Sequence, residues 1–231
     1  MVVPRLLPTA AADAAVAGMK YHISGELVPV LQLELGDQPV YFEHHILLWK
    51  DPDVQIGVKS LSGAFNRMLS GMPIFMTEAR GPGRIAFSRD AVGHIFAVHL
   101  SAGHGLDVRE HQFLAATDAV EFTSSTVKGF ANIFFGGSGL LIDHFFCRNG
   151  DGAVWLYGYG NVFEANLGDG EQIDIEPGGW VYKERRVQMD TAFTSLTTGL
   201  LSGTNMALNR FTGPGRVGFQ SMYYHPPTPN K

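Results

Sequence analysis

Apolar and polar residues alternate over short stretches along most of the chain, which is the pattern of half-buried β-strands. In the stretch 93–100, the side chains of Phe96, Val98 and Leu100 fall on one face at a period of two. The stretches 106–108 and 173–175 both consist of an acidic residue between two apolar ones. Gly103 and Gly170 stand between successive stretches, where tight turns are expected. The pattern predicts an all-β fold, with short helices expected only at 63–72 and 194–201.

The pattern recurs along the chain at a spacing of about 66 residues, the signature of an internal repeat. When the stretch 69–87 is aligned with 201–219, eight positions are identical, including the turn Gly-Pro-Gly-Arg at 81–84 and 213–216. At an offset of 67, residues in the stretch 93–107 recur: Gly93, Phe96, Leu100, Gly103 and Asp107 align with Gly160, Phe163, Leu167, Gly170 and Asp174. We therefore predict an internally repeated β-sandwich or barrel made of three pseudo-equivalent units.

The phase of the repeat predicts how the ends of the chain meet. The chain begins with the second half of a repeat unit, whose pattern is seen at 33–42. It ends with the first half of a unit, at about 199–222. To complete a third unit, the segment 27–48 is expected to pack beside 204–224. The predicted domain organisation is a disordered Ala-rich extension at 1–18, a single repeated β domain at 19–225 and a flexible tail at 226–231.

Composition and charge narrow the classes of function. Charged residues make up 17% of the chain, below the ~25% usual for soluble domains. The net charge of −5 disfavours nucleic acid as a partner, because that binding depends on neutralising phosphates with cations. No apolar run is long enough for a transmembrane segment. Cys147 is the only cysteine; it is expected to be a buried, unreactive thiol, and a reducing cytoplasmic location fits it.

Histidine is the residue type that most favours a metal site here. Four histidines fall close together in the sequence: His94, His99, His104 and His111. Metal sites of double-stranded β-helix enzymes use His-x-His, with both ligands on one face of a strand. His94 and His99 are separated by an odd number of positions and so face opposite sides of a strand. We expect structural or surface histidines; His99 and His104 remain the candidate metal ligands.

Other polar and aromatic residues are expected to be structural. Asp107 and Asp174 recur at matched positions between apolar neighbours, which favours outward-facing strand residues over a pair of catalytic acids. The aromatic residues that resemble a stacking platform are expected to pack in the core or a subunit interface: Trp155, Tyr157, Tyr159 and Trp180. No catalytic residue or cofactor site is predicted.

The chain resembles the family of altered inheritance of mitochondria protein 24, a mitochondrial biogenesis protein, and its bacterial relatives. The resemblance covers about residues 19–225 and includes the opening Met19-Lys20-Tyr21, the glycine-rich element 134–139, the pattern from Gly93 to Asp107, and 178–181. It implies a short variant of the double-stranded β-helix, similar to the tryptophan RNA-binding attenuation protein, and trimers with a ring-like arrangement of repeats. It implies no catalytic residues for this chain.

Two hypotheses of function follow. The first is a non-enzymatic homo-oligomeric binding or scaffold protein, a trimer by the resemblance, with an unknown ligand or protein partner. It is favoured by the repeat and by the low charge, because repeated units with spare sheet edges associate to cover them. The alternative is a cupin-like metal-dependent enzyme that uses the histidines from 94 to 111.

Overall fold

The computed structural model describes residues 2–60, 75–127, 140–193 and 207–223. Within these residues all regular secondary structure is β-strand, which confirms the all-β prediction. The helices predicted at 63–72 and 194–201 lie outside the described residues, as does the tail at 226–231. No helix of the described residues has the length and hydropathy needed to cross a bilayer.

Eighteen of the strands fall into three consecutive groups of six. The first group is β4 (Val30–Leu35), β5 (Val40–Phe42), β6 (Leu47–Lys50), β7 (Gln55–Ser60), β8 (Phe75–Arg80) and β9 (Gly83–Ser88). The second is β10 (Gly93–Ser101), β11 (Gly105–Arg109), β12 (Phe113–Thr117), β13 (Val120–Val127), β14 (Leu140–Cys147) and β15 (Asp151–Tyr159). The third is β16 (Val162–Leu167), β17 (Gln172–Ile175), β18 (Trp180–Glu184), β19 (Gln188–Phe193), β20 (Ala207–Thr212) and β21 (Gly215–Gln220).

The three groups follow one scheme of antiparallel pairing. In each group the first strand pairs with the sixth and the sixth with the third. The second strand pairs with the fifth, and the fifth with the fourth. Each third strand has a register shift against its sixth strand, between Leu47 and Trp49, between Phe113 and Ala115, and between Trp180 and Tyr182.

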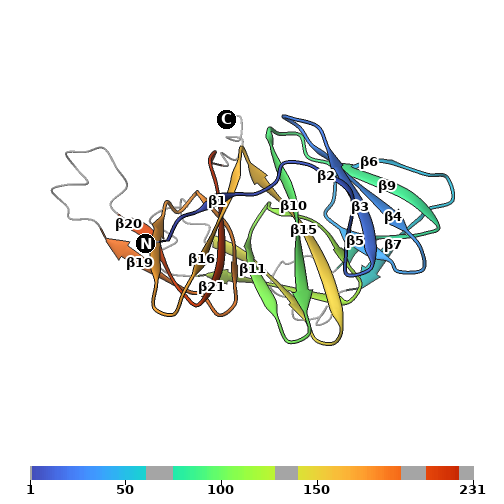
Figure 1. Ribbon diagram of the computed structural model, residues 1–231. Helices are drawn as coiled ribbons and strands as arrows, with labels where there is room; N and C mark the ends of the chain where they lie inside the picture. The colour runs from blue at the N-terminus through green and yellow to red at the C-terminus, as the bar shows by residue number, and fades with distance from the viewer. Residues whose placement is uncertain (1, 61–74, 128–139, 194–206, 224–231) are drawn as a thin grey trace, which may run out of the picture.

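Adjacent groups are joined by one further strand pair. The third strand of a group pairs with the second strand of the preceding group, so that β12 pairs with β5 and β18 pairs with β11. These junctions produce a six-stranded and a seven-stranded sheet, and the two ends of the row remain as a five-stranded and a three-stranded sheet. Figure 1 shows the result, an array with β6 and β9 at one end and β19 and β20 at the other.

The turn before the sixth strand illustrates why its sequence recurs. Gly83 and Gly215 have φ values of 134° and 135°, a region that favours glycine. A Cβ on either glycine would lie 2.9 Å from a methyl group, that of Val54 or of Val187. The Gly-Pro-Gly-Arg motif therefore meets the same backbone and packing requirement in the first and third groups.

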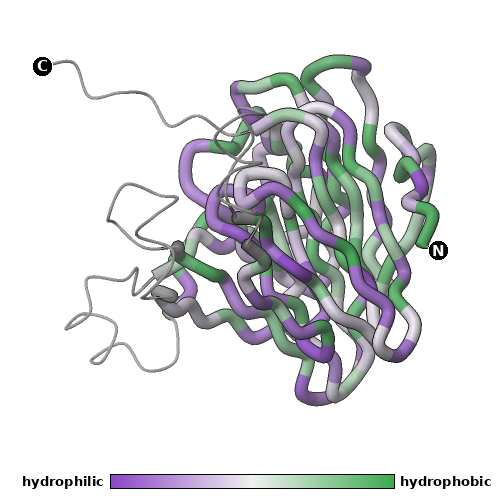
Figure 2. Tube along the Cα trace, turned by 90° about the vertical axis from the view of Figure 1, so that its left-hand side faces the viewer, coloured by the Kyte–Doolittle hydropathy of each residue, from purple (hydrophilic) through white to green (hydrophobic). Residues whose placement is uncertain are grey.

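The core is formed by apolar side chains of the strands, and the two central strands β12 and β15 are buried on both faces. Figure 2 shows hydrophobic and hydrophilic residues alternating along the strands, seen from the end that carries β19 and β20. Trp155, Tyr157 and Trp180 are fully buried and Tyr159 nearly so, as the sequence predicted for the aromatic residues. Cys147 is buried as well, and burial raises the pKa of its thiol, in agreement with an unreactive side chain.

The disordered extension expected at 1–18 is corrected by the structure, because two strands form within this segment. Strands β1 (Arg5–Leu6) and β2 (Ala11–Val16) extend two sheets, by pairing with β16 and with β3 (Met19–Ser24). Arg5 forms an ion pair of 2.8 Å with Glu164, and the amide of Leu7 donates to the carbonyl of Val162. Both partners belong to the third strand group, far along the chain, so the local composition gives no sign of them.

The expected contact between 27–48 and 204–224 is also wrong. Strand β4 pairs with β3 and β9, whereas β21 pairs with β16 and β18, and the two segments belong to opposite ends of the array in Figure 1. The reason is that the first strand of each group finds its partner in the sixth strand of the same group. A group therefore needs no piece from the far terminus.

Candidate functional site

The four clustered histidines do not form one site. His94 is buried on β10: its Nε2–H donates to the carbonyl of Pro8 at 2.6 Å, and its Nδ1 accepts from the amide of Val162 at 3.3 Å. These two bonds select the neutral imidazole, and burial lowers the pKa of His94. His94 is therefore structural rather than exposed, and it attaches the N-terminal segment to the second and third groups.

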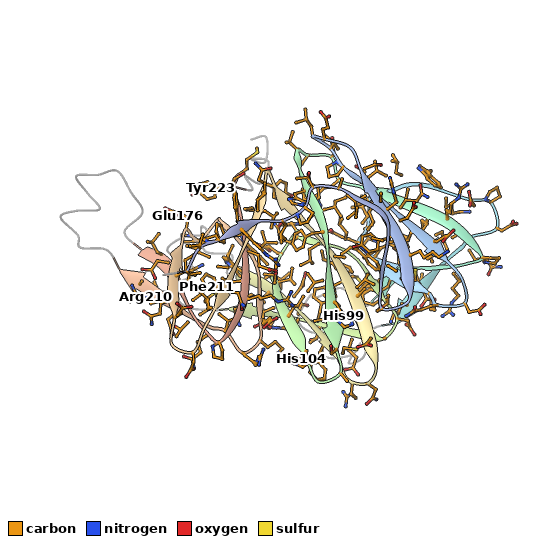
Figure 3. The ribbon with its side chains drawn as sticks, in the orientation of Figure 1. His99, His104, Glu176, Arg210, Phe211 and Tyr223 are labelled. Carbon is orange, nitrogen blue, oxygen red and sulfur yellow. The ribbon has the colours of Figure 1, made fainter. Side chains whose placement is uncertain are left out.

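His99 and His104 lie near the same end of β10 and β11 (Figure 3). Nε2 of His99 is 3.3 Å from a carboxylate oxygen of Asp151, and Nδ1 of His104 is 3.2 Å from the carbonyl of Ala102. His111 lies at a turn with φ of 65°. Within the described ranges, which include all four histidines, no group of three or more metal-ligating side chains is present. The geometry thus gives no support to the cupin-like metal centre of the alternative hypothesis.

A cavity beside His99 and His104 is rich in positive charge. It has a volume of about 490 Å³, and its ionisable lining residues are His99, His104, Glu184, Arg185, Arg186 and Arg216. Glu184 accepts hydrogen bonds from Arg216 at 2.7 Å and Arg186 at 3.4 Å. Burial raises the pKa of Glu184, but the hydrogen bond from Arg216 and the nearby positive charges lower it below its usual value. Three guanidinium groups and one carboxylate line this cavity, and two of the arginines also approach carboxylates outside the lining: Arg185 that of Asp107 at 3.9 Å and Arg216 that of Glu164 at 3.7 Å.

A row of polar side chains crosses the second junction, where β18 pairs with β11. Asp107 lies opposite Lys183 on one side and opposite His144 on the other. Nζ of Lys183 donates to Oδ2 of Asp107 at 2.7 Å, and Nδ1 of His144 donates to Oδ1 at 2.7 Å. Only 14% of the Asp107 side chain and 8% of that of Lys183 are exposed. The outward-facing position predicted for Asp107 is therefore wrong.

The environment of Asp107 stabilises its ionised form. Burial acts to raise the pKa of Asp107, but the hydrogen bonds from His144 and Lys183 and their positive charge outweigh burial and lower it. The guanidinium group of Arg185 lies farther away, with Nε 3.9 Å from Oδ1 of Asp107. An ionised carboxylate held between strands of two groups connects them through charge-assisted hydrogen bonds.

The same row ends in a serine on β13. Oγ of Ser125 is 2.7 Å from Nε2 of His144, so hydroxyl, imidazole and carboxylate follow in the order that activates serine nucleophiles in hydrolases. However, the three groups lie side by side on paired strands, the carboxylate is shared with Lys183, and the cavity beside His99 does not include Ser125. We interpret the row as a hydrogen-bonded network that connects four strands.

The first junction uses a different set of residues in the same register. Here β12 pairs with β5, and Tyr41 lies opposite Ala116. This pair is equivalent in position to Asp107 and Lys183 of the second junction. Tyr41 is buried, and its hydroxyl donates to the carbonyl of Val120 at 3.0 Å. Burial raises the pKa of Tyr41 well above its usual value, as do the charges of Asp118 and Asp143. One junction is thus closed by an aromatic residue and the other by an ion pair.

The two end strands of the array have no such partner in the described part of the chain. Strand β6 pairs only with β9, and β17 pairs only with β20. Three successive large apolar residues are exposed on β6: Leu47 (40%), Leu48 (55%) and Trp49 (38%). Edge strands of this kind present unpaired amide and carbonyl groups to other chains. Sequence reasoning missed β6 as a site because alternation predicts strands but not which of them lie at an edge.

Comparisons with known proteins give a family and a fold. The family model described as Mitochondrial biogenesis AIM24 matches residues 21–222. A crystal structure of protein SPYM3_0169 from Streptococcus pyogenes is similar over 89% of this chain and 94% of that chain, with a TM-score of 0.69 and 21% sequence identity. At this identity the likeness concerns the fold alone. No curated protein matches the chain.

Proposed function

The chain belongs to the Mitochondrial biogenesis AIM24 family, as its sequence predicted, and from this premise we propose that it is a non-enzymatic homo-oligomeric binding or scaffold protein. The functional form is then an oligomer in which the chains associate through the edge strands of their sheets. We propose a trimer, the size implied by the family resemblance. The physiological ligand or protein partner is a further component, bound by the assembled form.

The proposal includes three copies of one unit in a single domain. Support comes from the common pairing scheme of the three strand groups and from the register shift that each third strand has at the same place. We propose that the groups are three versions of the short double-stranded β-helix unit, similar to that of the tryptophan RNA-binding attenuation protein. Together they form the single repeated domain at 19–225, to which β1 and β2 add edge strands.

The observation that carries the proposal is that β6 and β17 each pair on one side only in the described part of the chain. An edge with three exposed apolar side chains is costly in water and favours association, because unpaired backbone groups and apolar surface are covered together. Ile56 and Val58 on β7, the edge strand of the six-stranded sheet, are exposed as well. A protein that needs only one chain gains nothing from this surface.

We propose a cytoplasmic location, which the single buried thiol supports, and no nucleic acid as partner, which the net charge of −5 supports. The proposed location and the exclusion of nucleic acid both fit an assembly that binds a protein partner or a small ligand.

Light scattering on the full chain tests the proposal. The expected result is a mass that is a multiple of the 25.2 kDa chain, three times that value for the proposed trimer, and that is stable on dilution. A mass of one chain at every concentration would contradict the proposal of a homo-oligomer.

A further inference from the structure

We infer that β6 of one copy pairs antiparallel with β17 of a second copy, in the register of the two junctions inside the chain. The inference rests on the proposed homo-oligomer and specifies its interface. Inside the chain there are two boundaries between groups, and at each one the third strand of a group pairs with the second strand of the preceding group: β12 with β5, and β18 with β11. The third strand of the first group is β6 and the second strand of the last group is β17, so one of each kind remains at the ends.

The register follows from two alignments. The shared register shift aligns the third strands and places Lys50 at the position of Ala116 and Lys183. The repeat at an offset of 67 aligns Asp174 with Asp107. Since Asp107 lies opposite Lys183, the junction between copies brings Asp174 opposite Lys50.

The charges at these two positions are complementary. On β17, Asp174 accepts two hydrogen bonds of 2.7 Å from Arg210 of β20, just as Asp107 accepts one from His144 of β14. The lysine that completes the Asp107 site has no counterpart beside Asp174 in the described part of its own chain. Lys50 supplies it from the second copy: the contacts of its Nζ to described residues are long, 3.4–3.5 Å, to the carbonyls of Asp51 and Pro52.

The apolar residues near this pair match in the same way. The register places Ile175 of β17 opposite Trp49 of β6, as Val108 lies opposite Tyr182 inside the chain. Pairing of the strands therefore covers part of the apolar surface of β6. In the two inner junctions, the backbone amides of Arg185 and Asp118 donate hydrogen bonds to the neighbouring group. Pro52 occupies the corresponding position after β6 and has no amide hydrogen, so the junction between copies has one backbone hydrogen bond fewer. The junction between copies is thus shorter than those within a chain and depends more on the Lys50–Asp174 pair.

The partner has to be a second copy, because one chain does not bring its own two ends together. In Figure 1, β6 lies at the opposite end of the array from β20, the strand that pairs with β17, and Figure 3 places Arg210 and Phe211 of β20 at that far end. An interface between two different surfaces of identical chains is heterologous. Such contacts form a ring when the rotation between copies closes and a filament when it does not.

Disulfide formation between two singly substituted proteins tests the inference. Residues directly opposite on antiparallel strands have Cα atoms about 4.5–5.5 Å apart, within the range for a disulfide. Full-length Lys50→Cys and full-length Asp174→Cys are prepared separately, mixed, dissociated and reassociated, and then oxidised. The native Cys147 is buried and stays in both proteins.

The expected result is a cross-linked dimer at twice the 25.2 kDa chain mass as the main product of the mixture, and only background dimer from either variant alone. The matched control replaces Asp174→Cys by Asp190→Cys on β19, the opposite edge of the same three-stranded sheet, and is expected to give background dimer with Lys50→Cys. An oligomer by light scattering without the mixed disulfide would overturn the β6–β17 interface and leave the proposed function standing. A monomer by light scattering would overturn both. Equal cross-linking with Asp190→Cys would overturn the assignment to β17.

Discussion

Asp107 and Lys183 lie directly opposite each other on β11 and β18, and a hydrogen bond of 2.7 Å joins their side chains. The two residues are distant in the sequence and belong to adjacent strand groups. Because both side chains are shielded from water, the carboxylate and the ammonium group depend on each other for charge compensation. The contact therefore serves as the polar link of one junction, and in the proposed assembly its counterpart joins separate chains.

Replacing Lys183 with methionine tests the strength of this link. Lys183→Met leaves the largely buried Asp107 with His144 as its hydrogen-bonding partner and also removes the bond to the carbonyl of Val187. We expect the free energy of unfolding to fall by about 2–4 kcal/mol, the cost of breaking a buried pair. Urea unfolding measures it. The control, Arg148→Met, removes an exposed partner of Glu121 and should leave stability nearly unchanged; equal losses in both variants would contradict the account.

The lowered pKa of Asp107 predicts a pH dependence of stability. A carboxyl whose folded-state pKa lies below its unfolded value of about 4 stabilises the fold above that pH, and the contribution disappears as the pH falls through the folded pKa. We expect Asp107→Asn to be less stable than the original chain near neutral pH and the two stability curves to converge in acid. Urea unfolding over a series of pH values gives both curves. Curves that stay parallel into acid would show that Asp107 is not the source of the effect.

The row from Ser125 to Asp107 gives a direct test of the non-enzymatic proposal. If the row is structural, a fluorophosphonate probe that labels activated serines should not modify Ser125, although its hydroxyl is 2.7 Å from His144. Mass spectrometry of the treated protein identifies the labelled residue. Labelling at Ser125 that is abolished by His144→Gln would contradict the proposal and indicate a hydrolase.

Charge reversal at Lys50 tests the β6–β17 interface without a cross-link. Lys50→Glu places two carboxylates opposite each other in the β6–β17 register, and like charges opposite each other on paired strands are destabilising. We expect the dissociation constant of the oligomer to rise about tenfold or more, equivalent to about 1.4 kcal/mol. Lys20→Glu changes the net charge equally and also places two carboxylates opposite each other, but it does so within one chain, against Glu34 of β4, and is expected to leave the mass unchanged on dilution. The idea fails if both variants dissociate alike.

Several features of the fold were accessible from the sequence because they depend on local patterns. Alternation over short stretches predicted strands such as 93–100, and the recurrence of Gly-Pro-Gly-Arg predicted the turns at 81–84 and 213–216. The family followed from the overall pattern of these elements. Burial of Trp155 and Trp180 followed from their apolar strand faces.

The features that the sequence did not predict depend on partners that are distant in the chain. Alternation correctly placed Asp107 between two apolar neighbours, but it carries no information on Lys183, which covers that face from the next group. In the same way, the order of residues 5–8 depends on Val162, Glu164 and His94. The candidate metal ligands His99 and His104 were grouped by spacing alone, and spacing does not determine which side chains converge.

Hydrogen–deuterium exchange on the assembled full chain measures the pairing of the two end strands, β6 and β17, most directly. We predict that the amides of Leu47–Lys50 and Gln172–Ile175 exchange as slowly as those of β12 and β5, the equivalent strands of an inner junction, while amides of the edge strand β19 exchange faster. Fast exchange in β6 and β17, at the rate of β19, would show that these edges stay open and would contradict the account.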